Sequence, residues 1–177
     1  MEFTKLNVGS RDELLDGWLN IDIEPLPKPR PNFMRMDVFA MPLVWRDTFE
    51  AVRSIHVMEH INRNMRLDFL KALHQVTAPK GMVYVEVPDF QETIRLLNQA
   101  YVDGNKEKQH IWTTSIYGKQ RSPGDRHCWG YTVETLSTMF FDAGFRFVTA
   151  HRSIDGVEQM ISGHHKQEPC LLVRGIK

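Results

Sequence analysis

Three residues suited to binding a nucleoside each follow a short apolar run: Gly9, Asp22 and Asp37. A carboxylate at Asp22 can accept hydrogen bonds from both hydroxyls of a ribose. A carboxylate at Asp37 can accept one from an adenine amino group, with Val38 and Phe39 beside the ring. Gly9 would let the backbone approach a ligand closely. Each residue alone has an ordinary explanation as a turn or a solvated acid, but the three together indicate a nucleoside site.

The segment from His56 to His60 has the spacing His-x-x-Glu-His. On a helix this spacing places two imidazoles on one face, as in one class of zinc peptidase. The residues before it form a predicted strand, and no third ligand is evident in a helical setting downstream. We therefore keep zinc binding by His56, Glu59 and His60 as an alternative, and otherwise expect no metal.

Strands and helices are expected to alternate along the chain. Alternating or β-branched apolar runs predict strands, and apolar residues at helical spacing predict helices. The expected strands are 6–8, 19–23, 33–36, 49–55, 82–87, 145–149 and 170–173, and the expected helices are 67–76, 90–100 and 132–144. This order predicts an α/β fold with a mostly parallel sheet, whose ligands bind at the carboxyl ends of the strands.

The composition bounds the class of protein. A chain of 177 residues with 42% hydrophobic residues fits one globular domain. The 22 basic and 22 acidic side chains give no net charge, which argues against a general nucleic-acid or anionic-membrane binder. No apolar run is long enough to cross a bilayer, and the first residues lack a signal pattern, so we expect a cytoplasmic protein. Cys128 and Cys170 are expected to be thiols.

Six segments resemble, in order, the motifs of the class I S-adenosylmethionine-dependent methyltransferases, and most of all their small bacterial and phage members. The segments are 6–10, 17–22, 36–38, 54–61, 78–81 and 85–89. The resemblance spans about residues 5 to 175. It implies a Rossmann-like, doubly wound, seven-stranded sheet in three α/β/α layers, mostly parallel with the last strand antiparallel. It also implies a single methyltransferase-like domain over residues 1–177.

The resemblance implies a set of contacts to the cofactor S-adenosylmethionine. These are the methionine part against Gly9 and Ser10, the ribose on Asp22, the adenine on Asp37 and Val38, the methyl-donor end beside Ser54 and His56, and the adenosyl group under Met58. Arg11 stands where the family usually has a glycine, and it could reach the cofactor carboxylate or weaken cofactor binding. This departure leaves a second function open, a catalytically silent binding or scaffold protein of the same fold.

Residues 110–131 are expected to form an inserted lid over the acceptor, because long loops rich in glycine, aromatic and basic residues are usually functional. Tyr117, Gln120 and His127 match a pattern in the related small members, which implies that they bind the substrate. Arg126 belongs to a local basic patch that could bind a phosphate. The acceptor is expected to be a small or sugar-like molecule, and the oligomeric state stays open.

Methyl transfer to a hydroxyl requires a base that removes its proton. Histidine has a pKa suited to this task. We expect His127 as the first candidate and His56 as the second, with Asp89 as an acid partner. The predicted reaction is transfer of a methyl group to an oxygen or nitrogen of the acceptor.

Overall fold

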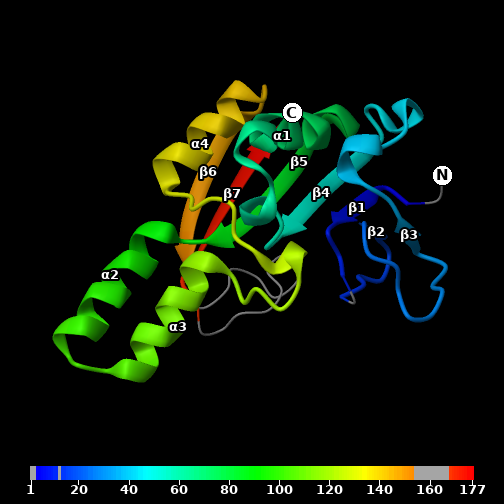
Figure 1. Ribbon diagram of the computed structural model, residues 1–177. Helices are drawn as coiled ribbons and strands as arrows, with labels where there is room; N and C mark the ends of the chain where they lie inside the picture. The colour runs from blue at the N-terminus through cyan, green and yellow to red at the C-terminus, as the bar shows by residue number, and fades with distance from the viewer. Residues whose placement is uncertain (1–2, 12, 154–167) are drawn as a thin grey trace.

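The computed structural model describes residues 3–11, 13–153 and 168–177, which form a seven-stranded sheet in the order β3-β2-β1-β4-β5-β7-β6 (Figure 1). The strands are β1 (Lys5–Val8), β2 (Leu19–Asp22), β3 (Phe33–Arg35), β4 (Phe49–Ile55), β5 (Thr77–Pro88), β6 (Arg146–Ser153) and β7 (Cys170–Ile176). β7 is antiparallel to both of its neighbours, and the other strand pairs are parallel. The predicted doubly wound sheet with an antiparallel last strand is confirmed.

The predicted strands are all present, with small differences at their ends. β4 has the predicted bounds, whereas β5 begins five residues earlier than expected, at Thr77 rather than Met82. Its pairing with β4 shifts register between Phe49 and Ala51, so the proline-glycine break lies within the strand and does not precede it. Apolar residues of the central strands are fully buried, and their burial fixes which face each strand turns to the core.

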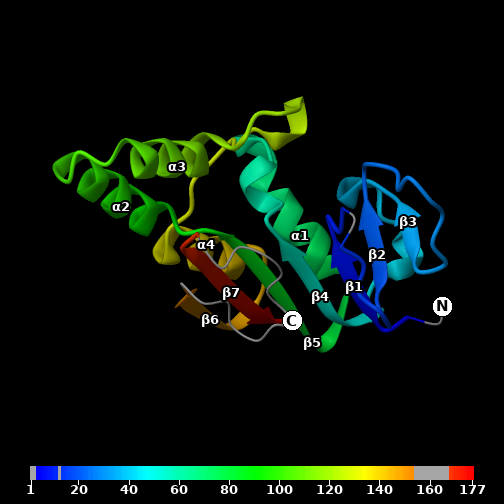
Figure 2. The ribbon, with the colours of Figure 1, turned by 90° about the horizontal axis from the view of Figure 1, so that it is seen from below.

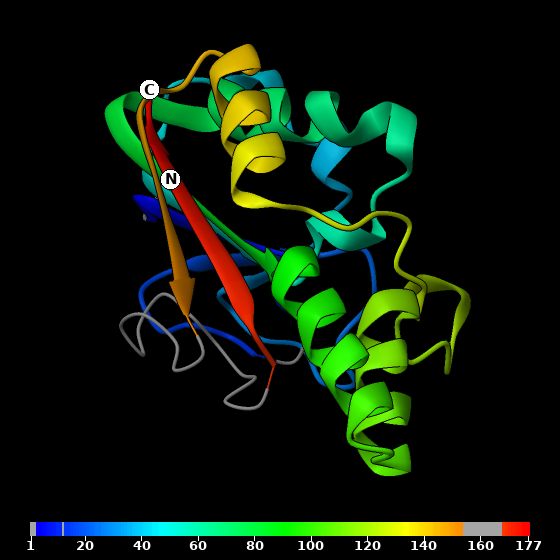
Figure 3. The same cartoon turned by 90° about the vertical axis from the view of Figure 1, so that its left-hand side faces the viewer.

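Helices α1 (Arg66–Val76) and α4 (Val133–Asp142) pack against each other on one face of the sheet (Figures 1 and 3). Phe69, Leu70, Leu73 and Val76 form the buried side of α1, at helical spacing. Short 3-10 helices lie in the connections: η1 (Val38–Ala40), η2 (Leu43–Trp45), η3 (Met58–His60), η4 (Arg63–Met65) and η5 (Pro123–Asp125).

Helices α2 (Phe90–Val102) and α3 (Lys106–Tyr117) form a hairpin that extends from the end of β5 (Figures 1 and 2). α3 differs from the expected loop, because the first part of the region 110–131 is helical. This helix packs on α2 and not on the central core, so its sequence has no continuous apolar stripe from which a helix could be predicted. None of the helices in the described ranges is long and apolar enough to span a membrane.

The connections that follow β1 and β2 contain no helix in their described residues, so no helix from these connections covers the second face of the sheet. The buried side chain of Asn20 holds these connections instead. It accepts hydrogen bonds from Asn7 Nδ2 and the Leu15 amide and donates to the carbonyls of Leu15, Trp18 and Asn32. A fully partnered buried amide can fix loops that lack a helix, because every broken bond would leave a polar group unsatisfied.

Candidate functional site

The carboxyl ends of β1, β2 and β3 meet at one edge of the sheet. The Gly9 amide donates to the carbonyl of Ile21 at 2.8 Å, and the Arg11 amide donates to Asp22 Oδ2 at 2.8 Å. Across the next strand, the Met36 amide donates to the carbonyl of Asp22 at 2.8 Å. Direct hydrogen bonds therefore join the end of β2, at Ile21 and Asp22, to Gly9 and Arg11 on one side and to Met36, the residue before Asp37, on the other.

The carboxylates of Asp22 and Asp37 are oriented by backbone amides. Asp22 accepts one hydrogen bond on each oxygen, from the amides of Arg11 and Glu24. Asp37 is exposed and caps η1 by accepting from the amide of Phe39 at 2.9 Å. A carboxylate oxygen can accept more than one hydrogen bond. Both groups thus keep acceptor capacity for a nucleoside.

Gly9 lies where β1 and the connection after β4 approach each other closely. Its φ is +71°, and an added Cβ would lie 2.1 Å from Val57 Cγ2, so no larger residue fits without movement. Arg11 also has a positive φ, +48°, a conformation that residues other than glycine rarely adopt. Its guanidinium reaches to 3.7 Å from Asp125 Oδ1. Arg11 thereby links the end of β1 to the region predicted as the lid.

Two predicted cofactor contacts are in the core instead. Met58 is fully buried among core residues, so its side chain is not available to cover an adenosyl group. Ser54 is also fully buried, and its hydroxyl has no hydrogen-bond partner among the described residues. The sequence correctly predicts that both residues lie near the end of β4. It does not predict which way each side chain points, because that depends on the local backbone conformation. Val38 and Ser10 are nearly buried as well.

His56 follows β4 with a positive φ of +53° and lies in a buried polar cluster. Its Nδ1 is 3.1 Å from Glu59 Oε1, and its Nε2 is 3.6 Å from Glu86 Oε1 and 3.7 Å from Cys170 Sγ. Burial opposes the charged form, yet hydrogen bonds with Cys170 and Glu59 hold the pKa of His56 well above its usual value. A protonated imidazole cannot act as a base, so this geometry disfavours His56 in that role.

Glu59 connects this cluster to the segment that carries His127. Burial opposes its charged form, but the hydrogen bond from His56 and the nearby His60 and His127 lower the pKa of its carboxyl. Its carbonyl accepts from the amides of Cys128 at 2.7 Å and Trp129 at 3.3 Å. These two bonds position His127 beside the end of β4.

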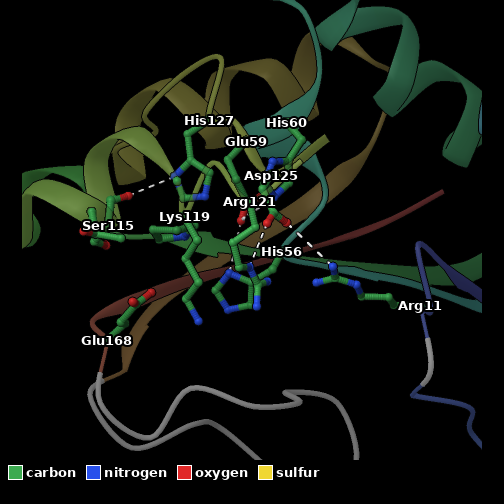
Figure 4. A pocket seen from close by; sticks show the side chains of 13 residues that line it. Arg11, His56, Glu59, His60, Ser115, Lys119, Arg121, Asp125, His127 and Glu168 are labelled. Atoms are coloured by element: carbon green, nitrogen blue, oxygen red, sulfur yellow. Dashed lines mark hydrogen bonds and ion pairs between the residues drawn. The ribbon is translucent and has the colours of Figure 1, made fainter. Parts of the chain in front are cut away.

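His127 borders a polar cavity of about 130 Å³ (Figure 4). The cavity is lined by Arg11, His56, Glu59, His60, Pro88, Thr114, Ser115, Gly118, Lys119, Arg121, Asp125, His127 and Glu168. The Ser115 carbonyl, 2.9 Å from His127 Nδ1, can only accept a hydrogen bond, so Nδ1 carries the proton and Nε2 keeps a lone pair. Burial lowers the pKa of His127, which favours this neutral form.

The zinc-peptidase alternative is wrong, because it requires an α-helix over residues 56–60 and the structure has none there. His56 ends the strand region, and only Met58–His60 form a short 3-10 helix. The two imidazoles are therefore not presented from one helical face. His60 lies instead with its ring edge-to-face against His127, with ring centroids 4.8 Å apart.

Asp89 has a structural task in the described residues. It caps α2 by accepting from the Glu92 amide at 3.1 Å, and its other oxygen is 3.0 Å from Arg152 Nε. It does not line the cavity, so nothing in this geometry makes it a partner of His127.

The predicted substrate residues near the end of α3 divide into two groups. His127 lines the cavity, whereas the side chains of Tyr117, Gln120 and Arg126 are exposed and do not line it. Their neighbours Lys119 and Arg121 do.

In the sequence, Glu59 is recognisable only as part of a zinc motif. Ser115 and Asp125, which also line the cavity, have no local signal in the sequence. These residues reach the cavity through contacts with segments far along the chain, such as that of Arg11 with Asp125.

Comparison with known proteins gives one family and many structural neighbours. A family model described as a methyltransferase domain matches residues 10–150. No curated protein matches the chain by sequence.

Solved structures match over nearly the whole chain. A SAM-dependent methyltransferase from Archaeoglobus fulgidus aligns with a TM-score of 0.64 at 13% identity, covering 99% of this chain and 88% of that one. The 1,6-didemethyltoxoflavin-N1-methyltransferase of Burkholderia thailandensis, solved with its substrate and S-adenosylhomocysteine, has a TM-score of 0.62 at 13% identity, with coverages of 98% and 70%. A 16S rRNA adenine methyltransferase from Catenulisporales acidiphilia has a TM-score of 0.55 at 14% identity, with coverages of 97% and 86%. These similarities establish the fold.

Proposed function

The chain belongs to the methyltransferase-domain family, and from this premise we propose that it transfers the methyl group of S-adenosylmethionine to a small or sugar-like acceptor beside His127. The predicted methyltransferase family, enzyme class and cofactor are confirmed by the family match over residues 10–150, whereas the likeness to small bacterial and phage members stays a prediction. The acceptor and the residues that act on it are our proposal.

The strand ends suit an adenosyl ligand. Asp22 would accept the ribose hydroxyls, and Asp37 with the backbone of Val38 would hold the adenine. The close approach at Gly9, where a Cβ would contact Val57, leaves backbone and no side chain toward the methionine part. When bound, the cofactor supplies an electrophilic methyl group on a sulfonium.

One observation supports the position of the acceptor. The cavity is lined both by Arg11 and His56, which follow β1 and β4, and by His127 from the segment after α3. An acceptor in it would lie between the cofactor edge of the sheet and the lone pair of His127 Nε2. Its hydroxyl could then lose its proton to Nε2 as the new oxygen–methyl bond forms and the sulfur–methyl bond breaks.

The size and charge of the cavity favour a small polar group. Its volume is below the several hundred Å³ typical of a site that encloses a complete drug-sized ligand. Charged side chains of both signs line it, including Arg11, Lys119, Arg121, Asp125 and Glu168. Such a lining suits a hydroxylated or amine-bearing group, while the rest of the acceptor would extend outside.

The test combines cofactor binding with turnover. We expect S-adenosylhomocysteine to bind in a calorimetric titration, and labelled methyl groups to pass from S-adenosylmethionine to members of a panel of sugars, amines and short RNAs. In His127→Ala we expect kcat to fall by about 10²- to 10⁴-fold with cofactor affinity preserved. His151→Ala, an exposed histidine on β6, is the matched control and should retain activity.

Three outcomes would contradict this proposal. No binding of S-adenosylhomocysteine at millimolar concentration would favour the silent scaffold protein. Methylation of RNA alone would replace the small acceptor. An unchanged kcat in His127→Ala would remove that residue from the proton transfer.

A further inference from the structure

Two histidines and a buried carboxylate converge at the inner wall of the cavity. One nitrogen each of His60 and His127 and one carboxylate oxygen of Glu59 all lie within 4.8 Å of one another (Figure 4). From this cluster we infer that the chain binds a divalent transition-metal cation through Glu59, His60 and His127.

The two imidazole rings are each oriented by a backbone carbonyl. His60 Nδ1 is 2.9 Å from the Arg126 carbonyl, and His127 Nδ1 is 2.9 Å from the Ser115 carbonyl. Because a carbonyl only accepts, both Nδ1 atoms are donors, and Nε2 is the ring atom through which each histidine would bind a metal. Donation of one ring N–H to a backbone carbonyl is the arrangement that orients metal-binding histidines.

Glu59 supplies a second, independent observation. Its side chain is 2% exposed, and its Oε2 has no hydrogen-bond partner among the described residues. An unpartnered oxygen on a buried carboxylate is costly, and a cation bound by this carboxylate would compensate its buried charge. Its other oxygen, Oε1, is engaged by His56 at 3.1 Å.

The ligand set indicates the class of cation. Two imidazoles and one carboxylate with open positions suit first-row divalent ions such as Zn²⁺, Fe²⁺ or Co²⁺, and not Ca²⁺ or Mg²⁺, which prefer oxygen ligands. His60 Nε2 is 4.0 Å from Glu59 Oε1. Bonds of about 2.1 Å would draw these atoms closer together, by roughly an ångström. All three residues line the cavity, which gives the ion a path of entry.

The consequence for catalysis rests on the proposed function, whereas cation binding does not. The Nε2 lone pair of His127 cannot accept a proton while it binds a cation. An acceptor hydroxyl bound to the ion would have a lowered pKa and would lose its proton to solvent water. With the cation bound, His127 would therefore act as a metal ligand, and solvent water would take over its task as the base.

The experiment uses the full chain after removal of metal with a chelator, without cofactor or acceptor. Titration with Co²⁺ should give visible d–d absorption that saturates at one ion per chain, with the same stoichiometry by calorimetry. We expect the affinity to fall by at least about tenfold in His60→Ala and in His127→Ala. Affinity should be retained in His151→Ala, the exposed-histidine control.

A second buried cluster gives an internal check. His56, Glu86 and Cys170 also lie within metal-binding reach of one another. Co²⁺ bound there would show sulfur-to-metal charge-transfer absorption and would lose affinity in Cys170→Ser, and this result would overturn the assignment. Absence of saturable binding in the unaltered chain, or full affinity in both His60→Ala and His127→Ala, would also overturn it. Circular dichroism checks that each variant is folded. The binding result does not depend on the proposed function, because the titration requires no methyl transfer.

Discussion

The proposed cofactor edge, at the carboxyl ends of β1 and β2, and the proposed acceptor cavity around His127 are built from contacts of different range. At the cofactor edge, Arg11 bonds to Asp22, eleven residues away, through a backbone amide. In the cavity, His60 bonds to the carbonyl of Arg126, sixty-six residues away. Pairing of parallel strands fixes the first region, whereas the second depends on how the segment after α3 packs on η3. We therefore expect changes at the two regions to affect different measurements.

The largest expected effect on cofactor affinity is at the cofactor edge. Asp22→Ala removes the carboxylate proposed to hold the ribose, and a hydrogen bond to a charged group contributes roughly 1.5–3 kcal/mol. We expect the affinity for S-adenosylhomocysteine, measured by calorimetry, to fall by about 10- to 100-fold. Asp16→Ala, at an exposed position in the preceding connection, should leave this affinity unchanged. Equal affinities for the two variants would break the assignment of this edge to the cofactor.

Gly9→Ala tests the backbone of the same region. The new Cβ would meet Val57 Cγ2 at 2.1 Å and would hold a positive φ, so we expect a loss of about 2–3 kcal/mol in the free energy of unfolding. Gly17→Ala is the matched control, since Gly17 also has a positive φ but no atom lies within 4 Å of its added Cβ. Its expected cost is about 1 kcal/mol. Denaturant titration of both variants measures the difference, and equal costs would mean that the contact with Val57 is not close.

Tyr131→Phe tests the acceptor cavity. The buried hydroxyl donates to the Met58 carbonyl at 3.2 Å and ties the segment after His127 to η3. Its removal should cost about 1 kcal/mol in the free energy of unfolding, because one hydrogen bond is lost while the Met58 carbonyl keeps the bond from the Ile61 amide. We expect a raised KM for the acceptor with unchanged affinity for S-adenosylhomocysteine. Tyr101→Phe, exposed on α2, serves as the control. A change in cofactor affinity instead would show that the two regions are coupled.

The same difference in range explains what sequence could predict. The strands, their parallel order and the pair Asp22 and Asp37 follow from local patterns, because a residue that ends a parallel strand must lie at the ligand edge. Met58 and Asp89 have equally suggestive positions, yet one packs in the core and the other caps α2. Local sequence cannot tell these outcomes apart.

The residues around His127 show the other limit of prediction. Glu59 was visible as part of a motif, but its contact with the 127–129 segment depends on tertiary packing. The α3 helix was missed because its apolar residues lack a helical stripe and it packs on a neighbouring helix. Long-range pairs of this kind have no counterpart in spacing or composition.

The smallest expected effect lies outside both regions and calibrates the comparison. Burial and the nearby Lys177 ammonium lower the pKa of His74, against the weaker opposing effects of a hydrogen bond with the Gly144 backbone and of Asp47. The unfolded chain, with an ordinary histidine pKa of about 6.5, therefore binds a proton at higher pH than the folded chain. Stability from this group is complete above that pH and declines as the pH falls through it. We compare the unaltered chain with His74→Gln by denaturant titration between pH 7.5 and pH 5. The free energy of unfolding should fall more in the unaltered chain, and the extra loss should be about 1 kcal/mol at most, because solvent screens a partly exposed group.

An identical pH dependence in the two proteins would mean that His74 has the same pKa in the folded and the unfolded chain. A change in cofactor or acceptor affinity in His74→Gln would show that this distant end of the sheet is coupled to the site.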